Sequence, residues 1–221
     1  MNIHENIIKH CLKNAMFITG TAYAGKSTMV ALLAEKHGLI PCGENYHFEL
    51  SNEIATPNIF PNLCYFQTMK DWQGFVNRTP DEYEAWIQGA NLEIEQFEIA
   101  HLMRISQHQK VIVDTNIPLK TLCKIANYNQ VAVMLSPQSM SVEKFFERGD
   151  KDKAFIKSQI MKSENPELTM ENYLNCIARI NSKERYEEFE KSGFFTLVRE
   201  DSEKDTRNEV LEKLERHFEL V

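Results

Sequence analysis

Eight consecutive residues near the N-terminus have the types and the spacing that bind a phosphate group. They match the pattern Gly-x-x-x-x-Gly-Lys-Ser at every fixed position. Apolar residues 16–18 precede them and predict a strand, and residues 28–37 follow them as a predicted helix that ends at Gly38. A strand, a glycine-containing turn and a helix in this order predict a phosphate-binding loop, called the P-loop below, made of Gly20, Thr21, Ala22, Tyr23, Ala24, Gly25, Lys26 and Ser27.

The fixed residues of the P-loop suit a bound triphosphate. Gly20 and Gly25 let the backbone turn tightly and point its N–H groups at an anion, and the following helix adds its positive N-terminal end. Thr28, in the first turn of that helix, joins the predicted phosphate contacts. Lys26 would reach the β- and γ-phosphates as a catalytic residue, and the Ser27 hydroxyl would ligate magnesium. We therefore expect ATP, or another nucleoside triphosphate, bound with Mg²⁺.

A second acidic element fits beside the P-loop. Residues 111–113 are Val-Ile-Val, an apolar strand that ends in the carboxylate of Asp114. This is the form of a Walker B element, in which Asp114 would hold magnesium directly or through water, next to Ser27. A carboxylate after a strand is also common as a plain turn residue or a helix cap, so the magnesium role is a hypothesis that depends on the P-loop.

The residues around Asp114 argue against several classes of nucleotide-hydrolysing protein. GTPases carry a glycine in an Asp-x-x-Gly element, whereas residues 114–117 here are Asp-Thr-Asn-Ile, and the chain has no Asn-Lys-x-Asp motif. AAA-type motors place Glu directly after the Walker B Asp, where this chain has Thr115. ABC-type ATPases need a Ser-Gly-Gly signature, which the sequence lacks. A compact kinase is the class that fits.

Five short apolar segments predict the strands that must position these residues. Each is continuously apolar rather than alternating, which is typical of buried strands in a parallel sheet, and predicted helices lie between them. The strands are expected at residues 15–19, 39–42, 111–115, 131–135 and 194–199. With 221 residues, no internal repeat and no low-complexity linker, the chain is expected to form a single α/β domain.

Two further helices have clear sequence signals. The longer one is predicted to begin at Thr79 as the N-cap, with Pro80 in the first turn and Glu82 completing a capping box. Its Glu-rich face is expected to be solvated, and its apolar stripe is expected to be core: Tyr83, Trp86, Ile87, Ala90, Ile94, Phe97 and Ile105. The second helix, at about residues 206–218, should pack on the sheet through Val210, Leu211, Leu214 and Phe218.

This order of elements resembles the nucleoside-monophosphate-kinase-like group of P-loop kinases, including the shikimate and gluconate kinase branch. The resemblance covers most of the chain, but only the P-loop is specific at the level of single residues. Residues 184–189 are also similar to a segment of shikimate-type kinases, although an ordinary helix would explain them too. The group implies a three-layer P-loop NTPase fold with a five-stranded parallel sheet in the order 2-3-1-4-5. It also implies an acceptor-binding insert at about residues 44–105 and a lid at about residues 137–165.

The lid candidates follow the fourth predicted strand, where residues 145–153 are Phe-Phe-Glu-Arg-Gly-Asp-Lys-Asp-Lys. Phosphoryl transfer spreads negative charge over the equatorial oxygens, which an arginine on a lid stabilises. Arg148 is the first candidate for this catalytic contact, and Lys151 and Lys153 are lesser candidates. A solvated, charged turn between two helices is the alternative.

On the acceptor side, Glu44 follows the second predicted strand. Members of the similar group often place an acidic residue there to orient or deprotonate an acceptor hydroxyl, so Glu44 is a candidate general base, with a surface-loop residue as the alternative. Arg78 and Arg104 are candidates to bind an anionic acceptor, but an ordinary salt-bridged arginine explains each of them as well. Residues 56–77 show no clear period and are too long for an ordinary connection, which favours a functional segment.

Composition limits the partners and the location. A net charge of −7 argues against a nucleic-acid partner unless one face concentrates the Lys and Arg residues. No apolar run approaches the ~20 residues of a membrane span, and the N-terminus does not have the form of a secretory signal. The five cysteines form no Cys-x-x-Cys pair, and His47, His101 and His108 show no metal-ligand spacing. This pattern favours reduced thiols, a cytoplasmic location and no zinc site.

These observations together predict a cytoplasmic ATP-dependent small-molecule kinase, whose partners are a nucleoside triphosphate and a small-molecule acceptor. Two alternatives stay open. The first is a regulatory P-loop NTPase that hydrolyses slowly, which would release ADP at a basal rate without responding to an acceptor. The second is a nucleic-acid end kinase, which would need a basic channel and salt-sensitive binding.

Overall fold

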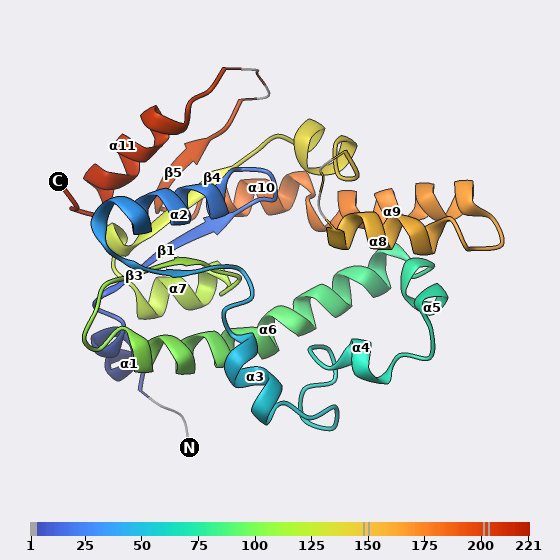
Figure 1. The fold of residues 1–221 in the computed structure, drawn as a ribbon, viewed down its shortest axis with the longest axis horizontal. Coiled ribbons are helices and arrows are strands. Elements are labelled where there is room, and N and C mark those ends of the chain that lie inside the picture. The colour runs from blue at the N-terminus through green and yellow to red at the C-terminus, as the bar shows by residue number, and fades with distance from the viewer. Residues whose placement is uncertain (1–3, 148, 150, 201, 203) are drawn as a thin grey trace.

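A five-stranded parallel sheet lies at the centre of the molecule (Figure 1). The computed structural model describes residues 4–147, 149, 151–200, 202 and 204–221. The strand order is β2-β3-β1-β4-β5, with β1 (Ala15–Gly20), β2 (Ile40–Cys42), β3 (Val111–Asp114), β4 (Val131–Leu135) and β5 (Phe195–Val198). The predicted α/β class and strand order are confirmed, and each predicted strand agrees with the observed one to within one residue at either end.

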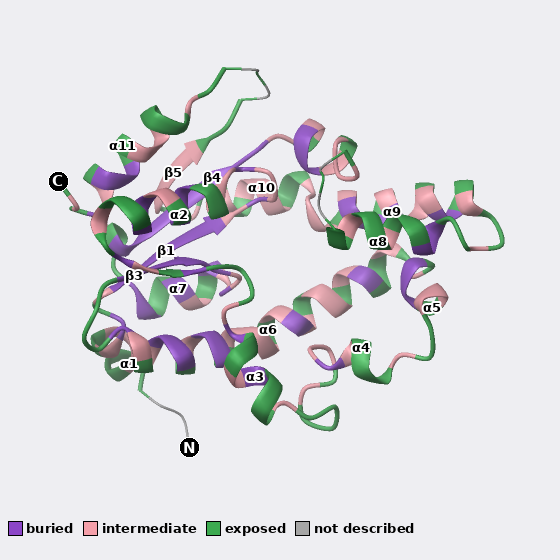
Figure 2. Ribbon diagram, viewed as in Figure 1, coloured by how far each residue is buried: buried purple, intermediate pink, exposed green. Residues whose placement is uncertain are grey.

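Burial of apolar side chains explains why the central strands form (Figure 2). β1, β3 and β4 are buried along almost their whole length, whereas the edge strand β5 is partly exposed. Ile18 of β1 pairs with Asp114 of β3, and Gly20 of β1 pairs with Met134 of β4. Because the carboxyl ends of these parallel strands meet at one edge, the P-loop and Asp114 leave the sheet side by side.

Helices cover both faces of the sheet (Figure 1). One face packs against α2 (Lys26–His37) and α11 (Arg207–His217). The other face packs against α1 (Glu5–Cys11), α7 (Leu119–Ile125) and the C-terminal part of α6 (Pro80–Ile105). The predicted packing of the C-terminal helix is confirmed, because its four named residues belong to the first of these cores: Val210, Leu211, Leu214 and Phe218.

Smaller elements complete the connections around β4 and β5. The segment after β4 contains a π-helical turn (Ser139–Glu143) and α8 (Lys151–Ile160), and it coincides with the expected lid. α8 packs against α9 (Pro166–Ile180), and α9 packs along α6. The remaining elements are the 3-10 turn Tyr128–Gln130 before β4 and α10 (Lys183–Glu190) before β5. No helix in the described ranges is long and apolar enough to cross a membrane.

The expected acceptor insert is built around the long helix α6. The predicted capping box is confirmed, because Thr79 Oγ1 accepts from Glu82 N while the Glu82 carboxylate accepts from Thr79 N at 2.8 Å. Before α6 lie three short helices: α3 (Phe48–Ile54), α4 (Tyr65–Thr68) and α5 (Trp72–Val76). Two of them, α4 and α5, fall within residues 56–77, where the sequence showed no clear period. Aromatic contacts between Phe66, Phe75 and Trp86 hold this region against α6.

The Glu-rich face of α6 does not match the prediction that it is solvated. Glu98 is 0% exposed. Glu93 accepts hydrogen bonds from Asn62 Nδ2 at 2.7 Å and from Leu63 N at 2.8 Å. Other segments pack against α6 on several sides. Its C-terminal half lies under the sheet, and its N-terminal half packs against the short helices that precede it in the insert (Figure 1). Part of its polar face is therefore enclosed.

Candidate functional site

The P-loop has a backbone conformation that depends on its glycines. Gly20 has a φ of 129°, and a Cβ at this position would lie 1.9 Å from the carbonyl oxygen of Met134. No larger residue fits there without moving β4. Gly25 has a φ of 90° at the N-cap of α2, and Tyr23 has a φ of 65°, a region that residues other than glycine rarely adopt. Three residues of this turn thus have a positive φ.

Several backbone N–H groups of the turn have no acceptor within the described chain. Those of Ala22, Ala24 and Gly25 donate to no carbonyl or side chain there. The N-terminus of α2 also has no side-chain cap, because its N-cap residue is a glycine. α2 is 12 residues long, so its first turn carries the positive end of a helix dipole. Unpaired N–H groups at such a position form a cradle for an anion.

A hydrogen-bonded link holds the P-loop to the end of β4. Thr21 N donates to the carbonyl oxygen of Met134 at 3.1 Å, and Ser136 N donates to Thr21 Oγ1 at 2.7 Å. Both Thr21 and Ser136 are buried. Ser136 was not among the sequence-predicted site residues, and its position directly after a predicted strand is the only signal that pointed to it.

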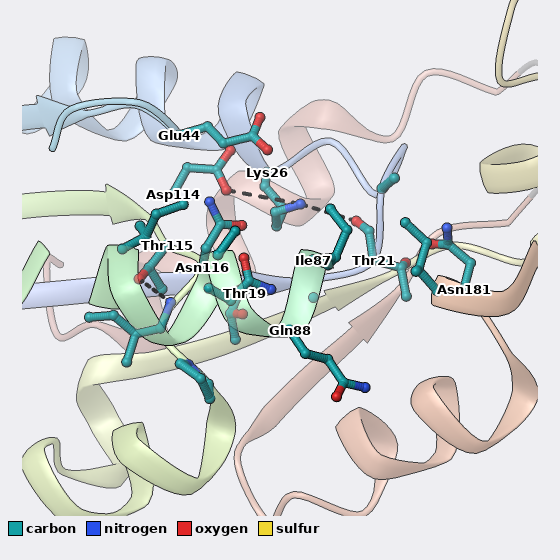
Figure 3. Close-up of a pocket in the computed structure, with 18 of the residues that line it drawn as sticks. Thr19, Thr21, Lys26, Glu44, Ile87, Gln88, Asp114, Thr115, Asn116 and Asn181 are labelled. Carbon is teal, nitrogen blue, oxygen red and sulfur yellow. Dashed lines mark hydrogen bonds and ion pairs between the residues drawn. The ribbon is translucent and has the colours of Figure 1, made fainter. Parts of the chain in front are cut away.

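Lys26 and Asp114 lie close together at the carboxyl ends of β1 and β3 (Figure 3), and Ser27 joins them through a hydrogen bond. The Ser27 hydroxyl donates to Asp114 Oδ2 at 2.8 Å, and Lys26 Nζ lies 3.9 Å from Asp114 Oδ1. Lys26 Nζ also donates to the carbonyl oxygen of Thr21 at 3.1 Å. A hydroxyl and a carboxylate are oxygen ligands of the kind that magnesium takes beside phosphate oxygens. The two predicted metal residues, Ser27 and Asp114, therefore fit that ion.

A second, buried carboxylate lies behind Asp114. Thr115 Oγ1 donates to Glu98 Oε2 at 2.6 Å and accepts from Ile117 N at 3.0 Å. Glu98 thereby fixes the start of the loop between β3 and α7. Burial raises the pKa of the Glu98 carboxyl to about 7, and the negative charge of Asp114 acts in the same direction. No sequence signal distinguished Glu98 from the other glutamates of α6.

A cavity of about 790 Å³ opens from the P-loop and has Glu44 in its lining. Its other walls include the loop after β2, the N-terminal half of α6, the loop after β3, and the segment from the end of α9 to α10 (Figure 3). Of the carboxylates in this lining, only Glu44 makes no hydrogen bond or ion pair within the described chain. The apolar stripe of α6 is not confined to the core as predicted, because four of its residues also line the cavity: Trp86, Ile87, Ala90 and Ile94.

The two arginines considered for an anionic acceptor do not line the cavity. The Arg78 guanidinium lies 4.0 Å from the ring centroid of Tyr65 and 5.2 Å from that of Trp86, so it packs into the aromatic cluster of the insert. Arg104 is exposed and lies 3.7 Å from a carboxylate oxygen of Glu49. Structural contacts therefore explain both side chains.

Lys153 is the lid candidate that reaches the P-loop. Its Nζ lies 3.4 Å from the Tyr23 hydroxyl and 4.6 Å from the centroid of the Tyr23 ring, and Lys153 lines the cavity. The Tyr23 hydroxyl in turn lies 2.7 Å from the carbonyl oxygen of Lys144, to which it donates. Lys151 is exposed and does not line the cavity. Arg148, the first candidate for the lid contact, lies outside the described residues.

The structure gathers most of the sequence-predicted residues at one cavity. Eight residues of the range 20–28 line it, together with Glu44 and Asp114, whereas Ala24 is buried in the core beside α2. His47 also lines the cavity, although its sequence position indicated no role. A scan of the chain against protein-family models found no match, and neither did a search of the curated proteins.

Proposed function

We propose that this chain is an ATP-dependent small-molecule kinase with a P-loop NTPase fold, similar to the nucleoside-monophosphate-kinase-like group. One observation carries the proposal: the uncapped start of α2, Lys26 and the Ser27–Asp114 pair all line a single cavity. The parallel sheet of order 2-3-1-4-5 supports the fold assignment. The free thiols of Cys11, Cys42, Cys64, Cys123 and Cys176 support the expected cytoplasmic location.

The P-loop end of the cavity would bind the triphosphate. The N–H groups of Ala22, Ala24 and Gly25 point to an anion-binding role, and Lys26 adds a positive charge beside them. Ser27 and Asp114 would hold magnesium against the phosphate oxygens, replacing their mutual hydrogen bond. The bound triphosphate and magnesium supply the transferable phosphoryl group and neutralise its charge.

The rest of the cavity has room and chemistry for an acceptor. Its volume lies within the roughly 300–1,000 Å³ that small-molecule sites occupy. Glu44 provides an unpaired carboxylate that can orient an acceptor hydroxyl and take its proton. Lys153 brings a cation from α8 to the P-loop, where it would stabilise the charge on the transferred group. Lid closure would bring Lys153 from Tyr23 to the phosphates.

Acceptor-dependent release of ADP tests this proposal against its first rival. The protein is incubated with magnesium and ATP, alone and with each member of a panel of hydroxyl- and phosphate-bearing metabolites. A kinase shows a rate that rises with one class of acceptor and saturates. A basal rate that no acceptor changes would contradict the proposal and favour a regulatory NTPase.

The second rival, a nucleic-acid end kinase, has less support from the lining of the cavity. The described cations that line it are Lys26, Lys153 and Arg185, and Arg185 lies 3.7 Å from Glu188. The whole chain carries a net charge of −7. A strand of nucleic acid needs a continuous positive path, because its affinity comes largely from phosphate contacts. Salt-sensitive binding of an oligonucleotide together with end phosphorylation would favour this rival.

A further inference from the structure

The cavity lining outside the P-loop includes side-chain amides that have no hydrogen-bond partner in the part of the chain that the structure describes. Asn45, Gln88, Asn91 and Asn116 line it, and none of these side chains makes a hydrogen bond within the described chain. They come from the loop after β2, from two adjacent turns of α6 and from the loop after β3. Each amide offers both donors and an acceptor without a charge. Such groups match the hydroxyl groups of a neutral ligand.

A buried histidine in the lining of the same cavity also supports an uncharged ligand. His47 is 1% exposed, and neither of its ring nitrogens has a hydrogen-bond partner among the described residues. Burial lowers the pKa of the imidazole to about 4, so the ring is neutral at physiological pH and has one donor and one acceptor. A buried polar group without a partner costs free energy unless a ligand or a water satisfies it. His47 belongs to the residues that line the cavity, where a ligand that reaches the ring nitrogens would satisfy them.

The charges of the cavity argue against an anionic acceptor. Lys26 and Lys153 lie at the P-loop, where the phosphates would take up their charge, and Arg185 lies beside Glu188. Glu44 adds a negative charge to the cavity lining and has no ion-pair partner among the residues that the structure describes. An acceptor that carries a phosphate or a carboxylate would lose its hydration there, and away from the P-loop the described cation in the lining is Arg185, which already lies beside Glu188.

Building on the kinase function proposed above, we infer that the acceptor is an uncharged polyhydroxy compound, of the sugar or nucleoside kind, held by His47, Asn91 and Asn116. An acceptor hydroxyl oxygen forms a bond to the γ-phosphorus while the bond from that phosphorus to the β–γ bridging oxygen breaks. Glu44 takes the hydroxyl proton, and ADP leaves with the electron pair of the broken bond. The products are the phosphorylated acceptor and ADP.

Matched pairs of acceptors test the inference with the full chain, magnesium and ATP. Each pair contains a neutral compound and its anionic counterpart: ribose and ribose 5-phosphate, glucose and gluconate, cytidine and cytidine monophosphate. We expect acceptor-dependent ADP release with kcat/KM at least about 10-fold higher for the neutral member of an active pair. A preference for the anionic member would overturn the inference while leaving the kinase function intact. ADP release that responds to no member would overturn the kinase function, and the inference with it.

An Asn91→Leu variant tests the assigned residues with a nearly isosteric change. With the best neutral acceptor, its KM for that acceptor should rise about 10-fold, the size of one lost hydrogen bond, while its KM for ATP stays unchanged. The matched control is Gln96→Leu, because Gln96 is exposed on the same helix and does not line the cavity. An unchanged acceptor KM in a folded Asn91→Leu protein would contradict the placement of the acceptor.

Discussion

The two ends of the cavity are built in different ways. The phosphate end comes almost entirely from residues 20–28, with Asp114 added from the neighbouring strand. The acceptor end gathers His47, Asn91 and Asn116 from three segments that are far apart in the sequence. A contiguous site leaves a recognisable spacing in the sequence, whereas an assembled site leaves none. This difference explains why the sequence contains a recognisable binding motif for the phosphate end and none for the acceptor end.

The two ends also differ in the atoms that would bind the proposed ligands. The phosphate end would use backbone N–H groups and depends on glycine conformations, so its shape depends on a few φ angles. The acceptor end relies on side chains that project from an ordinary helix and two loops. Substitutions at the phosphate end should therefore weaken ATP binding, turnover or folding, whereas those at the acceptor end should change the choice of substrate. The predictions below test this contrast, from the largest expected effect to the smallest.

Two glycine substitutions should lower the free energy of unfolding by very different amounts. In Gly20→Ala the new Cβ would lie 1.9 Å from the Met134 carbonyl oxygen, so β1 and β4 must separate, and the free energy of unfolding should fall by about 4 kcal/mol or more. Gly38→Ala places its Cβ in open space at a φ of 64° and should cost only about 1–2 kcal/mol. Urea denaturation of both variants measures the difference. Equal costs would contradict the close approach of the P-loop to β4.

Replacing the proposed Walker B carboxylate, Asp114, should affect turnover more than nucleotide binding. Asp114→Asn keeps the shape of the side chain but removes the charge that would hold magnesium beside Ser27. We expect turnover at limiting magnesium to fall about 10- to 100-fold, with recovery as magnesium is raised, since a charge-assisted contact contributes about 1.5–3 kcal/mol. Magnesium titrations of steady-state activity provide the measurement. Wild-type activity at limiting magnesium would remove Asp114 from the metal site.

Loss of the proposed lid contact should lower kcat and have little effect on ATP affinity. Lys153→Met keeps the length of the side chain and removes the cation that lies 3.4 Å from the Tyr23 hydroxyl. If Lys153 meets the phosphates only in the closed complex, kcat should fall roughly 10-fold with little change in ATP affinity. Lys157→Met, on the exposed side of the same helix, is the control. A loss of the same size in both variants would argue against a specific role for Lys153.

The last of these predictions concerns the pH dependence of stability rather than binding or turnover. The Glu98 carboxyl keeps its proton up to about pH 7 in the folded protein, against an ordinary pKa of 4.5. The folded state therefore binds more protons than the unfolded state between these values, and stability should fall as the pH rises from about 4.5 to 7. Glu98→Gln should remove this loss and stabilise the protein at pH 8 by up to about 3 kcal/mol. Denaturation of the wild type and the variant at pH 5 and pH 8 measures the change in the free energy of unfolding between the two pH values. If this change is the same in both proteins, Glu98 is not the group responsible.

Local sequence signals predicted the parts of the molecule that local forces determine. Continuous apolar segments located the strands, and Thr79 with Glu82 located the start of α6, because both depend on neighbouring residues. Glu98 could not be distinguished from the solvated glutamates of α6, since its burial depends on the distant segments that pack around that helix. His47 likewise became a candidate only when the fold brought its loop to the cavity.

Calorimetric titration of ATP into the wild-type protein and into Lys26→Ala tests the central claim most directly. Lys26 Nζ lies beside the P-loop carbonyl of Thr21 and near Asp114, where it would meet the β- and γ-phosphates. We predict one ATP site in the wild-type protein and an affinity about 10- to 100-fold lower in the variant, from the loss of a charge-assisted contact of about 1.5–3 kcal/mol. Lys13→Ala, at an exposed position outside the site, should bind like the wild type. No binding by the wild-type protein, or an unchanged affinity in a folded Lys26→Ala protein, would contradict the P-loop assignment.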